Sequence, residues 1–218
     1  MANWLNQTFF NFDKSAFILM NNLQKVAGGF FSPFCEFISF FGEGGIFLII
    51  LSLILMLFKK SRKAGACMLL AIGVGALFTN VILKNVVARA RPFNESALYQ
   101  AFWIDAGKCS VSEFSFPSGH TTVFMTSMTA LFLSTNKKKS WVLYIFVLLT
   151  GFARVYLIVH YLTDVLAGLL VGGATGVVGY YLGARLFKSF EKHSDKKACS
   201  FILNADFINL IKKTKSGI

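Results

Sequence analysis

Residues 46–58 read IFLIILSLILMLF, thirteen positions in a row with one hydroxyl and no charge. A helix needs about 20 apolar residues to cross the hydrocarbon core of a bilayer, so this run is too short by itself. We therefore expect the span to begin upstream, near Pro33, and to cover residues 33–58. The glycines of residues 42–45 (GEGG) predict a kink or an interruption within it.

The whole chain shares this apolar character. Of its 218 residues, 55% are hydrophobic and 15% are charged, and the mean hydropathy is +0.61. Soluble domains are about one quarter charged, so the composition indicates a membrane protein, and the length suits one domain. Backbone polar groups must be satisfied internally in lipid, which favours helices. The fold class predicted is an all-α polytopic membrane helix bundle with five transmembrane helices, at about residues 33–58, 64–83, 118–135, 141–159 and 163–187.

The two ends of the chain differ from these spans. Residues 1–32 are amphipathic and aromatic, with Trp4 and Phe9 near Lys14, and predict an interfacial helix at the membrane surface. A sixth span within residues 1–32 is the alternative. We assign residues 1–198 to one membrane domain. Residues 199–218 are expected to form a cytoplasmic tail, either as an amphipathic helix or as a basic segment without fixed structure.

The last predicted span, residues 163–187, carries a row of glycines. Small residues let helices approach each other closely in a membrane. We interpret this row as a packing surface rather than as part of a functional site. Its members are Gly168, Gly172, Gly173, Gly176, Gly179 and Gly183.

The formal net charge is +12, and the cations follow a membrane topology. They gather at residues 59–63, at 137–139 and between 185 and 215, which suits cytoplasmic connections under the positive-inside rule. Residues 84–117 and 160–162 would then face the outside. The interleaved aromatic and basic residues of a nucleic-acid surface are missing, so we expect no nucleic acid partner. The four cysteines lack the paired spacing of a disulfide framework or a zinc site.

Three short polar blocks interrupt the apolar sequence, and the first is KNVVARARP at residues 84–92. Lys84 and Arg91 stand on the face where positive charge is disfavoured, and an anionic ligand would explain them. A guanidinium matches phosphate oxygens with its planar fork, whereas an ammonium acts as a point charge. Ordinary cations that reach the membrane surface are the alternative.

The second block is FPSGH at residues 116–120, at the start of a predicted helix. A helix N-terminus presents free N–H groups and a partial positive charge to an anion. Ser118 adds a hydroxyl, Gly119 allows the backbone to approach a ligand, and His120 is an acid–base group. A plain helix start would explain the proline and serine but not the histidine.

The third block is ARVYLIVHYLTD at residues 153–164. Arg154 lies in apolar surroundings, where an ionised group is costly and therefore a functional candidate. A structural pairing of Arg154 with Asp164 or with carbonyl groups is the alternative. His160 and Asp164 are four positions apart, close to one helical turn. A carboxylate that accepts from Nδ1–H would leave Nε2 of His160 free as a nucleophile.

These three blocks resemble the pattern of the type 2 phosphatidic acid phosphatase family, K-x6-RP, PSGH and SR-x5-H-x3-D, in the same order. The resemblance departs at Ala153, where the family usually has serine. It implies that His160 attacks phosphorus to form a phosphohistidine, that Asp164 orients it, and that His120 transfers protons. The phosphate-binding residues that it implies are Lys84, Arg91, Ser118, Gly119 and Arg154.

The resemblance also implies a function. We expect an integral membrane hydrolase of lipid phosphates, with undecaprenyl diphosphate favoured over phosphatidylglycerophosphate and phosphatidic acid. The expected location is the plasma membrane, with the site facing outside, and neither a metal nor another cofactor is required. A non-catalytic lipid-phosphate binder or scramblase is the alternative from another class. A soluble vanadate haloperoxidase is disfavoured by the predicted spans, and a channel by the gathering of polar residues at one end.

Overall fold

A computed structural model describes residues 1–111 and 114–207, and every regular element in these ranges is helical. The elements include one 3₁₀ turn, η1, and one π-helical segment, η2. In chain order they are α1 (Ala2–Thr8), α2 (Phe10–Phe40), η1 (Glu43–Gly45), α3 (Ile46–Leu57), α4 (Arg62–Ala76), η2 (Leu77–Leu83), α5 (Lys84–Val87), α6 (Pro92–Glu95), α7 (Ala97–Asp105), α8 (Gly119–Ser134), α9 (Lys137–Ser140), α10 (Leu143–Tyr156), α11 (Leu162–Lys192) and α12 (Lys197–Asn204).

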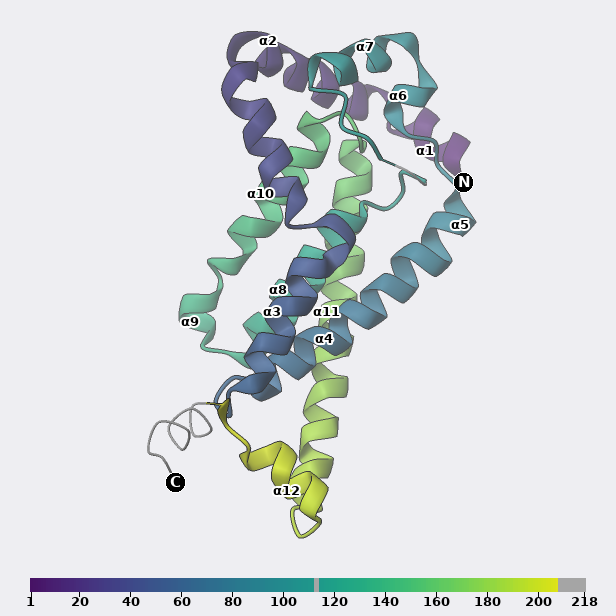
Figure 1. The fold of residues 1–218 in the computed structure, drawn as a ribbon. Helices are drawn as coiled ribbons and strands as arrows, with labels where there is room; N and C mark the ends of the chain where they lie inside the picture. The colour runs from purple at the N-terminus through teal and green to yellow at the C-terminus, as the bar shows by residue number, and fades with distance from the viewer. Residues whose placement is uncertain (112–113, 208–218) are drawn as a thin grey trace.

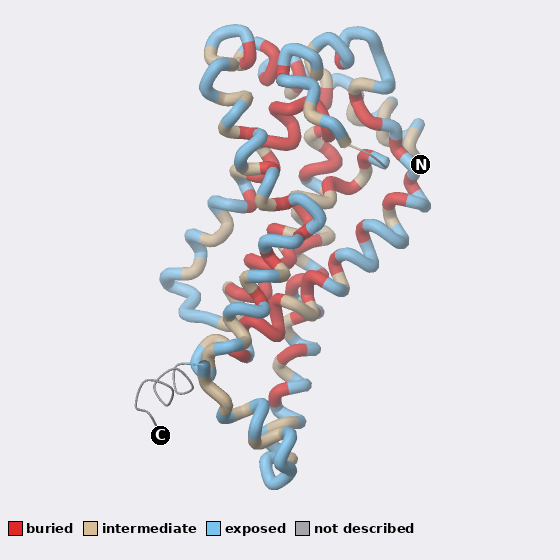
Figure 2. The backbone as a smooth tube through the Cα atoms, viewed as in Figure 1, coloured by how far each residue is buried: buried red, intermediate tan, exposed pale blue. Residues whose placement is uncertain are grey.

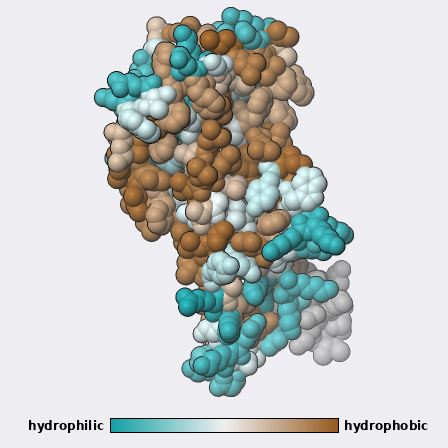
Figure 3. All heavy atoms as spheres, turned by 180° about the vertical axis from the view of Figure 1, so that it is seen from behind, coloured by the Kyte–Doolittle hydropathy of each residue, from teal (hydrophilic) through white to brown (hydrophobic). Residues whose placement is uncertain are grey.

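The fold class is confirmed as an all-α polytopic membrane bundle. Within the described residues, 4 helical stretches are long and apolar enough to cross a membrane: Phe10–Leu57, Arg62–Glu95, Lys137–Tyr156 and Leu162–Lys192. The remaining predicted span is α8, whose 16 residues extend about 24 Å at 1.5 Å per residue. That length is less than the hydrocarbon thickness of about 30 Å. Apolar atoms cover the middle of the surface in Figure 3, whereas hydrophilic atoms gather at its lower end.

No helix begins near Pro33, where the first span was predicted to start. Helix α2 runs from Phe10 to Phe40 with Pro33 inside it, and it bends at Ala27, where φ is −141° and ψ is 25°. In Figure 1 the first part of α2 lies across the end of the bundle beside α6 and α7, and the second part turns along the bundle.

The predicted interruption at residues 42–45 is confirmed. Gly44 and Gly45 have φ angles of 56° and 70°, which glycine adopts without steric penalty, and they separate α2 from α3. The turn redirects the chain, so that α3 continues toward the opposite end of the bundle in Figure 1. It also contacts the start of α8 through Gly45 and Val123, which matters for the site below.

The glycines of α11 pack against two helices, as predicted. A Cβ added at Gly168, Gly172 or Gly176 would lie within 3.0 Å of backbone oxygens in α8 or at its N-cap. Further along, Cβ atoms at Gly179 and Gly183 would lie 2.2 and 2.8 Å from the Cα atoms of residues 71 and 67 in α4. Helices α4, α8 and α11 therefore form the close-packed interior of the bundle.

The basic connections and the polar blocks lie at opposite ends of the molecule. In Figure 1 the α3–α4 connection, α9 and α12 occupy one end, and α5, α6, α7 and the start of α11 occupy the other. At the basic end, Arg62 donates to the backbone oxygens of Met56, Leu57, Ile202 and Ala205 and thereby holds α12 against the bundle. Residues 208–218 of the predicted tail lie outside the described residues.

Candidate active site

A cavity of about 290 Å³ collects most of the predicted site residues. It lies between the turn at η1, helix α4 with η2, the start of α8 and the α10–α11 turn. The predicted residues that line it are Lys84, Arg91, Gly119, His120, Arg154 and His160. Two histidines and three cations from segments far apart in the chain therefore face the same space.

His160 is held by the short turn between α10 and α11. Residues 157–159 of this turn are completely buried, and Ile158 adopts a left-handed φ of 56°, which is unfavourable for a β-branched side chain. Burial among the neighbouring apolar side chains fixes this conformation. Nη1 of Arg91 donates to the backbone oxygen of Val159 at 2.8 Å and lies 2.9 Å from Nε2 of His160.

The position of Asp164 explains how His160 is oriented. Its Oδ2 lies 3.6 Å from Nδ1 of His160, beyond hydrogen-bond distance but close enough for an electrostatic contact. The same oxygen accepts from Ser115 Oγ at 2.5 Å and from the backbone N–H of Tyr161 at 3.0 Å. The opposite side of the imidazole, at Nε2, faces Arg91 and the cavity. Because a guanidinium only donates, Nε2 carries the lone pair of the neutral ring and accepts from Arg91 in this structure.

The surroundings of His160 keep its imidazole neutral. Burial is the main cause, followed by the positive charges of Arg91, Arg154 and Lys84, and together they hold the pKa of His160 well below its usual range. A neutral imidazole retains the lone pair that a nucleophile needs.

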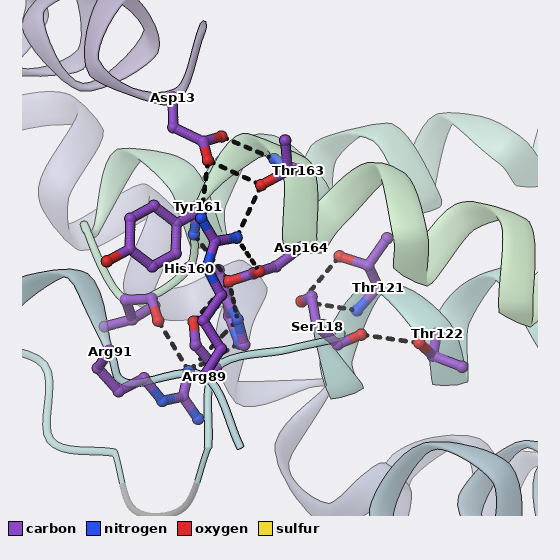
Figure 4. A network of polar contacts seen from close by, with 12 residues as sticks. Asp13, Arg89, Arg91, Ser118, Thr121, Thr122, His160, Tyr161, Thr163 and Asp164 are labelled. Atoms are coloured by element: carbon purple, nitrogen blue, oxygen red, sulfur yellow. Dashed lines mark hydrogen bonds and ion pairs between the residues drawn. The ribbon is translucent and has the colours of Figure 1, made fainter. Parts of the chain in front are cut away.

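Ser118 caps α8 and is absent from the cavity lining. Its Oγ accepts from Thr121 Oγ1 at 3.0 Å and from the Thr121 backbone N–H at 3.5 Å, and its own N–H donates to the backbone oxygen of Asp164 at 3.0 Å (Figure 4). This backbone contact joins the start of α8 to the first turn of α11. Ser118 thus aligns the helix that carries His120.

His120 packs against the turn at residues 42–45. Its Nε2 is 3.5 Å from a carboxylate oxygen of Glu43, and no hydrogen-bond partner for Nε2 occurs among the described residues. A Cβ at Gly42 would lie 2.5 Å from Cδ2 of His120, so only glycine lets the turn approach the ring this closely. Glu43 was not predicted as a site residue, because the glycines around it indicated only a break between helices.

The cation that pairs with Asp164 is Arg89, not Arg154. Arg89 Nη1 donates to Asp164 Oδ1 at 2.7 Å. Arg154 instead lines the cavity with only 1% of its surface exposed, and its Nε has no hydrogen-bond partner in the described part of the chain. The alternative in which Arg154 pairs with Asp164 is therefore wrong. Arg89 was visible in the sequence as a cation on the disfavoured face, but nothing in the pattern indicated its partner.

Comparison with known families agrees with this geometry. Residues 64–188 match the family described as the PAP2 superfamily, and they include all three polar blocks. The chain belongs to the PAP2 superfamily. The matched segment covers α4 to most of α11 and leaves α1, α2 and α3 outside it.

Individual PAP2 relatives differ in the lipid that their names specify. The chain is 31% identical over 137 residues to an undecaprenyl-diphosphatase from Sulfolobus acidocaldarius, which covers 62% of this chain and 63% of that protein, less than two thirds of its length. It is 32% identical over 170 residues to a lipid A 4'-phosphatase from Bacteroides thetaiotaomicron, with 72% and 74% covered.

A solved structure supports the fold. The crystal structure of the first transmembrane PAP2 type phosphatidylglycerolphosphate phosphatase from Bacillus subtilis matches with a TM-score of 0.56 at 23% identity. The match covers 85% of this chain and 97% of that chain. At this level of identity the likeness shows the helical arrangement alone.

Proposed function

We propose that this chain is an integral membrane phosphatase that hydrolyses a phosphomonoester or diphosphate on a lipid, with undecaprenyl diphosphate as the favoured substrate. The observation that carries the proposal is the shared cavity, in which His160, with Asp164 behind it, faces His120 and three cations. Binding a lipid phosphate would require only the cations. The two histidines and the carboxylate favour catalysis over a binder or a scramblase.

In the first step Nε2 of His160 attacks phosphorus, so that an N–P bond forms while the P–O bond to the leaving group breaks. His120 gives its proton to the departing oxygen. Asp164 stabilises the positive charge that develops on the imidazole of His160. Lys84, Arg91 and Arg154 hold the non-reacting oxygens, with backbone N–H groups at Gly119, and stabilise the charge of the transition state.

In the second step water replaces the nitrogen at phosphorus. His120, now neutral, accepts a proton from the water as the P–O bond forms and the N–P bond breaks. Inorganic phosphate leaves, His160 returns to its neutral form, and His120 carries the proton needed for the next turnover. These side chains supply every proton and charge in the cycle, so we expect turnover without a divalent metal.

Location favours a lipid substrate that keeps its tail in the bilayer. The cavity is lined by residues of the three polar blocks. These blocks lie toward the end of the bundle opposite the lysine-rich connections, which the positive-inside rule assigns to the cytoplasm. We therefore place the site at the outer face of the plasma membrane. The undecaprenyl-diphosphatase relative supports the diphosphate, and the lipid A and phosphatidylglycerolphosphate phosphatases keep lipid phosphomonoesters as the second candidate.

The decisive experiment measures phosphate release by the purified protein in detergent with EDTA present. We expect turnover that persists in EDTA, is blocked by orthovanadate and disappears in His160→Ala. A radiolabelled terminal phosphate should be recovered on the wild-type protein after an alkaline quench, which preserves phosphohistidine. Turnover that requires added Mg²⁺, or that survives in His160→Ala, would contradict the mechanism.

A substrate panel tests the specificity. Undecaprenyl diphosphate, phosphatidylglycerophosphate, phosphatidic acid and lipid A should be compared by kcat/KM at equal surface dilution in the same detergent. We expect the highest value for undecaprenyl diphosphate. Comparable values for all four would reject the substrate preference but retain the phosphatase. No release from any of them, combined with tight phosphate binding, would favour the non-catalytic binder.

A further inference from the structure

Arg89 is the centre of a buried network next to the candidate nucleophile. Its guanidinium donates to Asp164 Oδ1 at 2.7 Å, to Asp13 Oδ2 at 3.0 Å and to Thr163 Oγ1 at 2.8 Å (Figure 4). It also lies over the ring of Tyr161, 3.6 Å from the centroid. None of the Arg89 surface is exposed. The mechanism proposed above does not use this arginine.

Asp13 lies in the first part of α2, far outside the segment that matches the family. Its side chain is buried in α2 and accepts from the backbone N–H of Thr163 at 3.0 Å and from Thr163 Oγ1 at 2.8 Å. Both carboxylate oxygens of Asp13 are therefore directed at the first turn of α11 and at Arg89. In Figure 2 the end of the bundle where the first part of α2 lies mixes buried and exposed residues, and Asp13 is among the buried ones.

The charges of these groups have a consequence for His160. An arginine that paired only with Asp164 would neutralise the carboxylate that faces the imidazole. With Asp13 present, the cluster of Asp13, Arg89 and Asp164 carries two negative charges and one positive charge. The remaining negative charge lies on the side of His160 away from the cavity, where Asp164 Oδ2 is 3.6 Å from Nδ1. In buried surroundings such a charge acts strongly, because water screens it little.

We propose that Asp13 and Arg89 are positioning residues that act through Asp164, Arg89 by fixing its carboxylate and Asp13 by preserving its negative charge. This inference rests on the proposed function, because it concerns the stabilisation of the His160 imidazolium in a phosphohistidine. It assigns a role in the chemistry to α2, which carries none of the three polar blocks. Neither residue contacts the cavity that would hold the phosphate.

The negative charge of Asp13 predicts opposite effects on phosphate binding and on catalysis, whereas a merely structural role predicts the same effect on both. Replacing Asp13 by asparagine leaves the shape nearly unchanged but makes the neighbourhood of the site one unit more positive. Inorganic phosphate in its ground state should then bind as tightly as before or more tightly. The phosphohistidine step should be slower, since the imidazolium loses its compensating charge. A variant that only loosened the α2–α11 contact would weaken both.

The test compares Asp13→Asn with wild type in two measurements, steady-state kcat and KM on the diphosphate substrate and calorimetric titration with inorganic phosphate. We expect kcat to fall about 10- to 100-fold, as for other groups that orient a catalytic ligand from behind, with KM little changed. The dissociation constant for phosphate should stay equal or decrease. A matched control is Asp105→Asn. The Asp105 carboxylate in α7 accepts a hydrogen bond at 3.1 Å from Asn21, which lies in α2 as Asp13 does.

A second variant restores the charge balance. In Asp13→Asn combined with Arg89→Gln, a neutral hydrogen-bonding pair replaces the two ions, and the charge of Asp164 is again uncompensated. We expect the double variant to recover part of the kcat lost in Asp13→Asn. If Asp13→Asn does not fold, the double variant is compared directly with wild type, where activity above that of His160→Ala supports the proposal and activity equal to it overturns it.

The outcomes separate this inference from the proposed function. The inference is overturned if Asp13→Asn behaves as Asp105→Asn does, if it weakens phosphate binding together with kcat, or if the double variant is slower than the single one. A wild-type protein that releases no phosphate from any lipid would refute the function. The phosphate titration then still decides the charge coupling, with tighter binding in Asp13→Asn supporting it and weaker binding opposing it.

Discussion

At the scale of single residues, the neighbours of a guanidinium decide what it does. Arg89 is fully paired with carboxylates, so its charge is used in holding the structure of the site. Arg91 contacts the ring of His160 and the backbone oxygen of Val159, and these contacts hold its guanidinium group at the edge of the cavity. Arg154 is buried and lines the cavity, where an anion would compensate its charge. Three arginines within one site thus have separate tasks.

The lowered pKa of His160 predicts a pH-dependent stability. In the unfolded chain this imidazole gains a proton below pH about 6.5, whereas in the folded protein it stays neutral. The unfolded state therefore binds more protons at acid pH, and stability decreases as the pH falls through that value. One such group costs about 1.4 kcal/mol at a pH of about 5.5 relative to neutral pH.

The measurement is thermal unfolding in detergent at both pH values, for wild type and for His160→Gln. The wild-type melting temperature should decrease more on acidification than that of the variant. An identical decrease in both proteins would show that His160 is protonated in the folded state as readily as in the unfolded one.

Motif spacing identified Asp164 and the cations and histidines that line the cavity, but not Arg89 and Asp13, which lie behind Asp164. Lys84, Arg91, His120 and Arg154 could be selected because charge and imidazole are rare in apolar sequence. The partners of Arg89, by contrast, are 76 and 75 positions away in the chain, at Asp13 and Asp164. No local periodicity links such positions. Only the path of α2 across the end of the bundle brings them together.

At the scale of elements, the turn at η1 and the helix α8 fit each other because Gly42 has no side chain. Gly42→Ala would place a methyl group 2.5 Å from Cδ2 of His120. The ring must then move, and a displacement of about 1 Å in a catalytic group can reduce the rate about 10²-fold. We expect kcat to fall strongly, while the melting temperature in detergent changes little.

Gly29→Ala is the control, since a Cβ at Gly29 meets nothing within 4 Å. It should leave kcat as in wild type. Equal activities of the two variants would mean that the turn moves freely and does not position His120.

The contact between α11 and α4 gives a second prediction at this scale. In Gly179→Ala the added methyl group would lie 2.2 Å from the Cα atom of Ala71, so the helices must separate. Overpacking of this kind typically costs about 1–3 kcal/mol. The melting temperature should decrease, in contrast to Gly73→Ala on α4, where the methyl group meets no atom within 4 Å. Similar melting temperatures would contradict the close packing.

Sequence patterns predicted these elements unevenly. The apolar run at residues 46–58 and the glycines before it located α3 and its N-terminal break correctly. Residues 10–32 were predicted as a helix separate from the first span because they mix aromatic, polar and charged side chains, several of which are buried against the rest of the bundle. Asp13 and Asn21 look like surface residues in the sequence, yet each is 2% exposed. Tertiary partners, which local composition does not show, account for the difference.

At the scale of the whole molecule, the basic connections lie at one end and the polar blocks at the other. Cys109 follows α7 at the end that carries the cavity, and Cys199 lies in α12 at the basic end. We expect a membrane-impermeant thiol reagent, applied to intact cells, to label Cys109 and to spare Cys199. The buried Cys35 and Cys67 serve as internal controls that react only after unfolding.

Single-cysteine versions of the protein allow each position to be read separately by a mass shift on gels. Labelling of Cys199 from outside, with Cys109 protected until the cells are opened, would place the cavity on the cytoplasmic side. The assigned orientation would then be reversed.

The buried cluster of Asp13, Arg89 and Asp164 also bears on how the protein is made. During translation Asp13 is synthesised first, Arg89 much later, and Asp164 after most of the chain. Until the last of them arrives, the earlier charges have no complete set of partners in a poorly hydrated region, which is costly. The cavity and the network behind it are therefore complete only when translation has reached α11. Until then the charge balance of the cluster is incomplete.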